Sequence, residues 1–84
     1  MVELTVRYFA GARAAAGVPD ENFEFPGEPT VADVLALVHQ RHGVRLARVL
    51  AAASFLLDGV AVRDRGIAVR PGSRLDVLPP FAGG

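Results

Sequence analysis

The sequence predicts an α+β domain in which one main helix crosses one face of a mixed sheet of about five strands. Several short segments alternate apolar and polar residues, a pattern typical of strands with one buried and one solvent-exposed face. A single segment carries apolar residues at clear helical spacing, and turn-forming dipeptides separate the segments. At 84 residues the chain has room for one hydrophobic core and therefore for one domain.

The first third of the chain predicts two strands with a short helix between them. From Val2 to Phe9 every second side chain is apolar up to Tyr8, which indicates a strand. An Ala-rich stretch follows, long enough for two helical turns and closed by Gly17, a residue suited to a helix C-terminus. The segment "ENFEF" then alternates again and predicts a short strand before the Pro26–Gly27 turn.

The main helix is expected from Thr30 to His42. Thr30 is a suitable N-cap, and Asp33 occupies the capping-box position. Gly43 ends the helix, and an irregular turn is expected over the following "VRLARVL". The apolar residues that follow the i, i+3, i+4, i+7 rule are Val31, Val34, Leu35 and Val38.

Three more strands are expected in the second half. The segments "AAASFLL" and "VAV" flank Asp58–Gly59, a dipeptide typical of type I′ hairpins. A turn at Pro71–Gly72 precedes "SRLDVLPP", in which Leu75 and Val77 point inward and Arg74, Asp76 and Leu78 point outward. This order fits a ubiquitin-like β-grasp, whose first and last strands lie parallel at the centre of the sheet. We expect a β-grasp domain over residues 1–78 and an exposed tail over 79–84.

Composition excludes several classes of function. Nine acidic residues balance nine basic ones, and the bases are scattered, so we expect neither a nucleic-acid partner nor a membrane partner. The longest mainly apolar run is too short to span a bilayer, and a cytoplasmic protein is the expectation. The chain has no cysteine, and His39 and His42 have no evident third ligand, so no metal site is expected.

The ending "PPFAGG" is the most informative stretch for function. From Pro79 an extended chain reaches at most ~20 Å, enough to enter a deep pocket in a partner. Gly83 and Gly84 have no Cβ, so a narrow channel can hold them while a nucleophile approaches the terminal carbonyl. A free carboxylate needs activation, and we expect a partner to form an acyl-adenylate from it with ATP. All nine basic residues are arginine, so no lysine of the chain can attack an activated end.

Two apolar residues fall on the polar face of their strands. Phe9 and Leu78 would make an exposed apolar patch beside the tail if the first and last strands are neighbours. Val60, just after the hairpin turn, is expected to extend the patch. No catalytic motif is present, so the chain is expected to have no catalytic residues of its own.

Both ends of the chain resemble the small subunit of molybdopterin synthase, a family of ubiquitin-like sulfur carriers. "YFAGARAAAG" is similar to that family's F-A-x-x-R-E-x-x-G, and "VLPPFAGG" to its strand-P-P-x-x-G-G ending. The resemblance implies that an adenylating enzyme of the ubiquitin-activating type uses ATP to activate Gly84, which becomes a thiocarboxylate. The molybdopterin synthase large subunit then receives the tail, and sulfur passes to a pterin precursor of the molybdenum cofactor. No cofactor bound by this chain is implied.

The resemblance also assigns roles to residues near the end. It implies a tail channel that holds Phe81, Ala82 and Gly83, and a docking surface made by Phe9, Val60 and Leu78. The chain departs from the family pattern at three positions, namely Ala14, Leu57 and Phe81. Three alternatives stay open: a sulfur carrier for thiamine or cysteine synthesis, a ubiquitin-like protein modifier, and an interaction domain whose tail is never activated.

Overall fold

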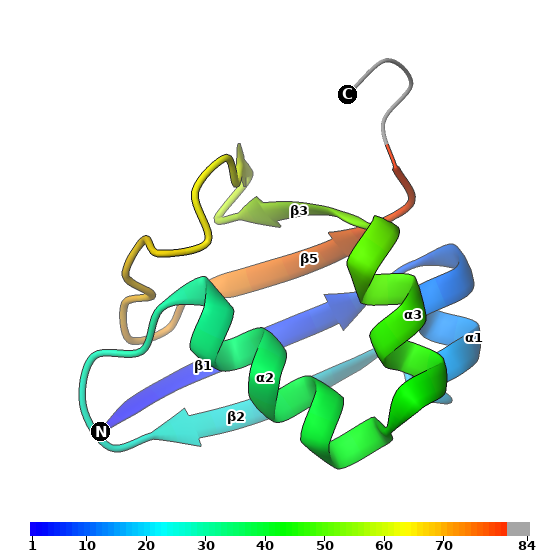
Figure 1. The fold of residues 1–84 in the computed structure, drawn as a ribbon. Helices are drawn as coiled ribbons and strands as arrows, with labels where there is room; N and C mark the ends of the chain where they lie inside the picture. The colour runs from blue at the N-terminus through cyan, green and yellow to red at the C-terminus, as the bar shows by residue number, and fades with distance from the viewer. Residues whose placement is uncertain (81–84) are drawn as a thin grey trace.

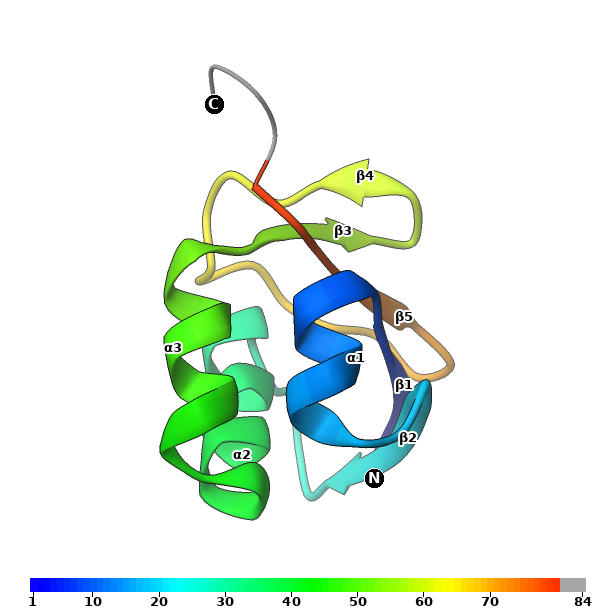
Figure 2. The ribbon, with the colours of Figure 1, turned by 90° about the vertical axis from the view of Figure 1, so that its right-hand side faces the viewer.

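The computed structural model describes residues 1–80, and residues 81–84 lie outside the described part. A five-stranded sheet has the strand order β2-β1-β5-β3-β4, and Figures 1 and 2 show helices covering one of its faces. β1 (Val2–Tyr8) and β5 (Arg74–Leu78) are neighbours and run parallel, whereas β1 pairs antiparallel with β2 (Asp20–Phe25). The predicted β-grasp arrangement is confirmed.

The hydrophobic core lies between the sheet and the helices. On β1 the alternation predicted from the sequence is confirmed, because Val6 and Tyr8 are buried while Arg7 between them is not. Leu75 and Val77 of β5 are fully buried beside them. Burial of such apolar side chains is the main favourable term in folding, at about 1.5–3 kcal/mol for each large residue.

The two predicted helices are confirmed. α1 (Ala10–Ala16) ends at Gly17, which has the left-handed φ of 78° that a glycine adopts without strain. α2 (Val31–His42) begins with a complete capping box: the Asp33 N–H donates to the Thr30 hydroxyl at 3.2 Å, and the Thr30 N–H donates to the Asp33 carboxylate at 2.9 Å. These two bonds satisfy helix-end donors that would otherwise lack partners.

The expected irregular turn over "VRLARVL" is wrong, because this stretch forms a third helix, α3 (Val44–Ala52). Leu46 and Leu50 are one turn apart and buried against the core, while Arg45 and Arg48 remain exposed. Leu, Arg and Ala also have high helix propensity. The helix layer therefore contains α2 and α3 side by side rather than one main helix, and Ala51 and Ala52 belong to α3 instead of a strand.

The hairpin and the last turn are confirmed. β3 (Ser54–Leu57) and β4 (Val60–Ala61) are joined by Asp58 and Gly59, whose φ values of 50° and 83° are those of a type I′ turn. At the second turn the Ser73 N–H donates to the Arg70 carbonyl across Pro71–Gly72. Both turns lie where the strand pattern breaks in the sequence.

Strand β5 ends at Leu78, which is also the end of the predicted β-grasp domain. The division into a domain over 1–78 and a tail over 79–84 remains a prediction, since most of that tail falls outside the described residues. Within residues 1–80 no helix combines the length and the apolar composition needed to cross a membrane.

Candidate functional site

The candidate reactive end lies just beyond the described part of the chain. Gly84, the expected thiocarboxylate position, falls outside the described residues, and so do the three expected channel residues, Phe81, Ala82 and Gly83. What the structure describes is the surface from which this segment leaves. We call Leu78, Pro79 and Pro80 the tail root.

An apolar groove lies beside the tail root. Its volume is about 210 Å³, and Phe9 and Leu78 both line it, as the predicted patch requires. The remaining lining residues come from α1, α3 and the tail root: Ala10, Gly11, Ala12, Val49, Ala52, Ala53, Pro79 and Pro80. Small side chains from both helices leave the groove open between the larger ones. The structure therefore places Phe9 and Leu78 in one surface at the end of the sheet.

The local backbone fixes Phe9 in this position. Its N–H donates to the Val77 carbonyl at 3.1 Å, and its own carbonyl accepts from Ala12 at 3.1 Å as the N-cap of α1. The chain turns at Ala10, which has a φ of 50°, a left-handed conformation that costs a non-glycine residue about 1–2 kcal/mol. Strain of this kind clusters at functional sites. Phe9 keeps 37% of its surface exposed, whereas Tyr8 is buried.

Val60 does not belong to this groove. Directly opposed residues of an antiparallel strand pair lie on the same face of the sheet. Val60 is opposite Leu57 on β3, and Leu57 is opposite the buried Leu75 on β5. Val60 therefore lies on the helix side of the sheet, at its edge and 70% exposed. The residue that shares the outer face is Ala61, which is opposite Leu56. Val60 therefore does not line the apolar groove with Phe9 and Leu78, and its expected part in docking a partner stays a prediction.

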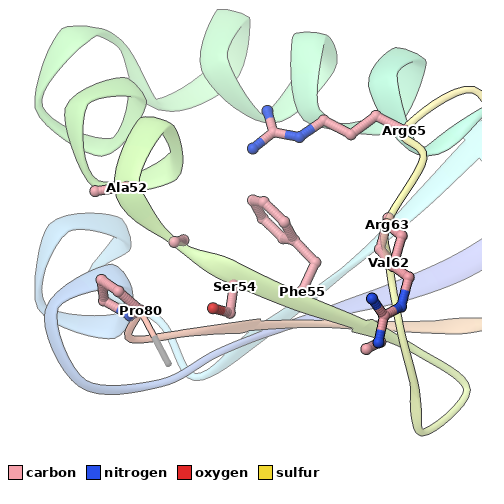
Figure 3. Close-up of a pocket in the computed structure, with 9 residues that line it drawn as sticks. Ala52, Ser54, Phe55, Val62, Arg63, Arg65 and Pro80 are labelled. Atoms are coloured by element: carbon pink, nitrogen blue, oxygen red, sulfur yellow. The ribbon is translucent and has the colours of Figure 1, made fainter. Parts of the chain in front are cut away.

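A second hollow, of about 450 Å³, also borders the tail root, at Pro80 (Figure 3). Ala52, Ala53 and Pro80 line both hollows, so the two surfaces are continuous. Arg63 and Arg65 line the second one, and sequence reasoning missed them. Their loop is positioned by hydrogen bonds to the first turn of α2, and no hydrophobic periodicity in the sequence encodes such contacts.

An ion pair on the outer face of the sheet lies next to the groove. Arg7 donates two hydrogen bonds to Asp76, at 2.7 and 2.9 Å, and its guanidinium carbon lies 5.4 Å from the centre of the Phe9 ring. The hydrogen bond to Asp76 raises the pKa of Arg7. Asp76 was expected to face solvent but is 6% exposed, because Arg7 covers it. This ion pair links β1 to β5 two residues before the tail root begins at Leu78.

A second polar cluster lies away from the tail root, where Glu21 of β2 meets β1 and α2. Tyr8 donates to Glu21 at 2.7 Å, His42 shares the same carboxylate oxygen, and Arg41 lies 3.6 Å from the other oxygen. Burial and the hydrogen bond to Glu21 raise the pKa of the Tyr8 hydroxyl. Burial alone would raise the pKa of Glu21, but the hydrogen bonds from Tyr8 and His42 outweigh it and lower that pKa.

This cluster accounts for His42 in structural terms. The sequence places His42 on the apolar stripe of the helix. In the structure its side chain packs against Glu21 and Tyr8 and is only 14% exposed. Within residues 1–80 no three His, Asp or Glu side chains gather closely enough to hold a metal ion. The described chain also brings no nucleophile and general base together beside the tail root.

Comparisons with known proteins agree with this geometry. The sequence model of the ThiS family matches residues 6–84. A molybdopterin synthase sulfur carrier subunit from Chlamydomonas reinhardtii is 31% identical over 84 residues, which cover 99% of this chain and all of that protein. The crystal structure of the small archaeal modifier protein SAMP1 from Haloferax volcanii is 26% identical with a TM-score of 0.82, over 98% of this chain and 99% of that one.

A more distant structure shares the fold alone. In a complex of subunits 1 and 2 of the molybdopterin-converting factor from Helicobacter pylori, the matching chain is 16% identical with a TM-score of 0.74, over 99% of this chain and all of that one. The family match begins within β1 and covers the other strands, the helices and the diglycine ending together. The chain is a member of the ThiS family.

Proposed function

We propose that this protein is a sulfur carrier that serves as the small subunit of molybdopterin synthase. The observation that carries the proposal is the likeness to a molybdopterin synthase sulfur carrier subunit along the whole length of both chains. The fold supports it, because the strand that leads into the chain end lies at the centre of the sheet, bonded to a strand on each side. Such a scaffold holds the tail root steady while the end is presented.

The proposed reaction takes place at the carboxyl group of Gly84. A partner enzyme of the ubiquitin-activating type uses ATP to convert this carboxylate to an acyl-adenylate and releases pyrophosphate. Sulfur at the oxidation level of sulfide then attacks the acyl carbon and displaces AMP, which leaves a thiocarboxylate. The thiocarboxylate afterwards gives its sulfur to a pterin precursor. We also propose a cytoplasmic location for the carrier, where an ATP-dependent partner enzyme can act on it. Phe81, Ala82 and Gly83 are proposed to lie in the partner's channel during transfer.

The proposed receiving partner is the molybdopterin synthase large subunit. The Helicobacter pylori complex supports it, since a chain of the same fold belongs to that assembly of subunits 1 and 2. The apolar groove supplies the docking surface, with Phe9 and Leu78 as its large side chains. Phe9 and Leu78 are already partly buried in the free chain, so covering the rest of their surface gains less than the about 1.5–3 kcal/mol of a full burial each. Contacts along the rest of the groove must therefore help to offset the cost of ordering tail residues at about 1–2 kcal/mol each.

Intact mass of the protein purified from its own cells tests the proposal. A carrier is expected to show, at its C-terminus, a mass gain equal to the difference between sulfur and oxygen. The same spectrum establishes whether the mature chain ends at Gly84, as the chemistry requires. A mass that corresponds only to the free carboxylate, in cells that are making molybdenum cofactor, would count against the proposal.

A second candidate function is protein modification through an amide between Gly84 and a lysine of a target. The likeness to SAMP1, at 26% identity and a TM-score of 0.82, favours keeping it. Tagged protein recovered from its own cells under denaturing conditions separates the two functions. A modifier is expected to appear covalently attached to other proteins, whereas a dedicated sulfur carrier is expected to be recovered only as the single chain.

A further inference from the structure

We propose that Arg63 and Arg65, called here the arginine pair, form a second docking element that receives an acidic segment of the protein that binds the tail. This inference deepens the proposed function and rests on it, because it concerns the same partner. The arginine pair lines the hollow of about 450 Å³ that adjoins the apolar groove at Ala52, Ala53 and Pro80.

The loop that carries the arginine pair is held by the start of α2. The Arg65 carbonyl accepts a hydrogen bond from the Ala32 N–H at 2.9 Å, and the Ile67 carbonyl accepts one from the Val31 N–H at 3.1 Å. The first-turn amides of a helix need such external partners, so the helix end and the loop stabilise each other. Just before Arg63, the Val62 N–H donates to the Phe55 carbonyl at 3.0 Å and fixes the loop to β3.

The Arg65 side chain is fixed at its far end as well. Its guanidinium carbon lies 4.9 Å from the centre of the Phe55 ring, within range of a cation–π interaction. A guanidinium held in this way loses less side-chain entropy when it forms further hydrogen bonds. Phe55 itself is buried in the core, so it makes a rigid support for the stacked arginine.

The arginine pair has no acidic partner within the described part of the chain. Arg7 is bonded to Asp76, and Arg41 lies near Glu21, but no carboxylate among residues 1–80 lies within 4.0 Å of either member of the pair. Asp64 lies between them in sequence, but its carboxylate accepts a hydrogen bond from the Gly66 N–H at 2.8 Å. Both guanidiniums therefore keep donors available for an external carboxylate.

Geometry favours an acidic protein segment over a single small anion. In Figure 3 the two guanidinium groups do not point toward one another, so they do not converge on one small ion. They suit carboxylates spaced along a peptide. Because Ala52, Ala53 and Pro80 line both hollows, a protein seated in the apolar groove is brought directly against the arginine pair. The partner recognised here therefore presents an apolar contact and, beside it, acidic side chains.

The test measures association and dissociation rates for the molybdopterin synthase large subunit of the same organism. The charge-reversed variant Arg63→Glu/Arg65→Glu is compared with wild type at about 50 mM and about 500 mM salt. We expect its association rate at low salt to fall by ~10-fold or more, and its dissociation rate to change by less than ~3-fold, as is typical of charges at an interface rim. The difference is expected to shrink at high salt, where screening is strong.

Two further variants make the test specific. Arg45→Glu/Arg70→Glu makes the same change in net charge at exposed positions that line neither hollow, and its association rate is expected to stay within ~3-fold of wild type. Arg63→Gln/Arg65→Gln removes the charge without reversing it, and is expected to give an intermediate loss. Thermal unfolding of Arg45→Glu/Arg70→Glu is expected to match wild type, because both side chains are exposed. Both variants at Arg65 lose its contact with Phe55 and are expected to unfold cooperatively at a slightly lower temperature.

The outcomes separate this inference from the proposed function. If wild type binds the large subunit and all variants associate at the wild-type rate, the arginine pair is not a docking element. The sulfur carrier proposal is then unaffected. Equal slowing by both charge-reversed variants also overturns it, because a general charge effect then accounts for the rates. Self-association that the Arg63→Glu/Arg65→Glu variant abolishes would assign the hollow to a second copy of the chain. Failure of wild type to bind the large subunit overturns both proposals.

Discussion

Two regions of the molecule differ in whether their side chains are satisfied within the chain. In the Glu21 cluster, formed by Tyr8, Glu21, Arg41 and His42, the polar groups bond to one another, whereas beside the tail root apolar and charged side chains stay exposed. At the Glu21 cluster, Tyr8, Arg41 and His42 converge on one carboxylate from two other elements of the fold. At the tail root, Phe9 remains 37% exposed, and the arginine pair faces no carboxylate among residues 1–80. Groups that satisfy one another contribute to folding, and groups left unsatisfied are available to a partner.

This difference predicts that substitutions divide into two classes. Changes at the Glu21 cluster are expected to lower the free energy of unfolding without affecting docking. Changes at the tail root and beyond it are expected to affect docking or sulfur transfer without affecting stability. The following variants test this division, from the largest expected effect to the smallest.

Deletion of Gly84 is expected to abolish sulfur transfer entirely, because the proposed reactive carbonyl is lost and the new end carries Gly83 in a shifted position. The midpoint of thermal unfolding is expected to be unchanged, since the strands, helices and buried side chains described above lie within residues 1–80. Intact mass measures the thiocarboxylate, and calorimetry measures stability. A deletion variant that still carries sulfur, or that unfolds at lower temperature, would contradict the assignment of function to the chain end.

Substitution of Phe9 by Asp is expected to weaken docking to the large subunit by ~30-fold or more. A charge in the apolar groove removes a buried aromatic contact and must be desolvated on binding, and such central contacts are typically worth 2 kcal/mol or more. Titration calorimetry measures the dissociation constant. Stability is expected to hold, because Phe9 is partly exposed.

Val60→Asp is the matched control for Phe9→Asp. Val60 lies on the helix side of the sheet and outside the groove, so its substitution is expected to change the dissociation constant by less than ~3-fold. Family resemblance places Val60 in the docking surface, whereas strand register places it on the other face. A loss of affinity equal to that of Phe9→Asp would support the resemblance and contradict the register argument.

The case of Val60 illustrates how much the sequence could predict. Alternation, the capping box and the Asp58–Gly59 dipeptide predicted the strands, α2 and the hairpin, because each is a local pattern with a physical cause. The position of Val60 outside the apolar groove could also have been inferred from the sequence. A two-residue turn at positions 58 and 59 places residue 60 opposite residue 57, so the turn type alone fixes the face of each β4 residue.

Other features depend on contacts that no local pattern encodes. α3 begins directly after Gly43, without a side chain that caps it, so the usual signal of a helix start is missing. The burial of Asp76 depends on Arg7 of the neighbouring parallel strand, far away in the sequence. Likewise, Glu21 looks like an ordinary strand carboxylate until β1 and α2 are packed against it.

Substitution of Glu21 by Gln is expected to lower the free energy of unfolding by about 1–3 kcal/mol, because hydrogen bonds to a charged group are lost while Tyr8, Arg41 and His42 stay in place. Urea denaturation measures the change. Glu24→Gln, on the same strand but exposed, is the matched control and is expected to change stability by less than about 0.5 kcal/mol. Affinity for the large subunit is expected to be the same for both variants. Equal destabilisation by both would show that the Glu21 cluster is not a distinct source of stability.

The smallest expected effect is a pH dependence of the stability that Glu21 provides. The pKa of Glu21 lies below its ordinary value of 4.5 in the folded state, so the folded chain binds fewer protons at this carboxyl than the unfolded chain does. The stabilisation is therefore complete above the ordinary pKa and is lost as the pH falls through the lowered folded value. The difference in unfolding free energy between wild type and Glu21→Gln, followed by urea denaturation from about pH 5.5 downward, is expected to shrink below pH 4.5. A difference that grows on acidification would mean that burial, rather than the hydrogen bonds from Tyr8 and His42, controls this carboxyl.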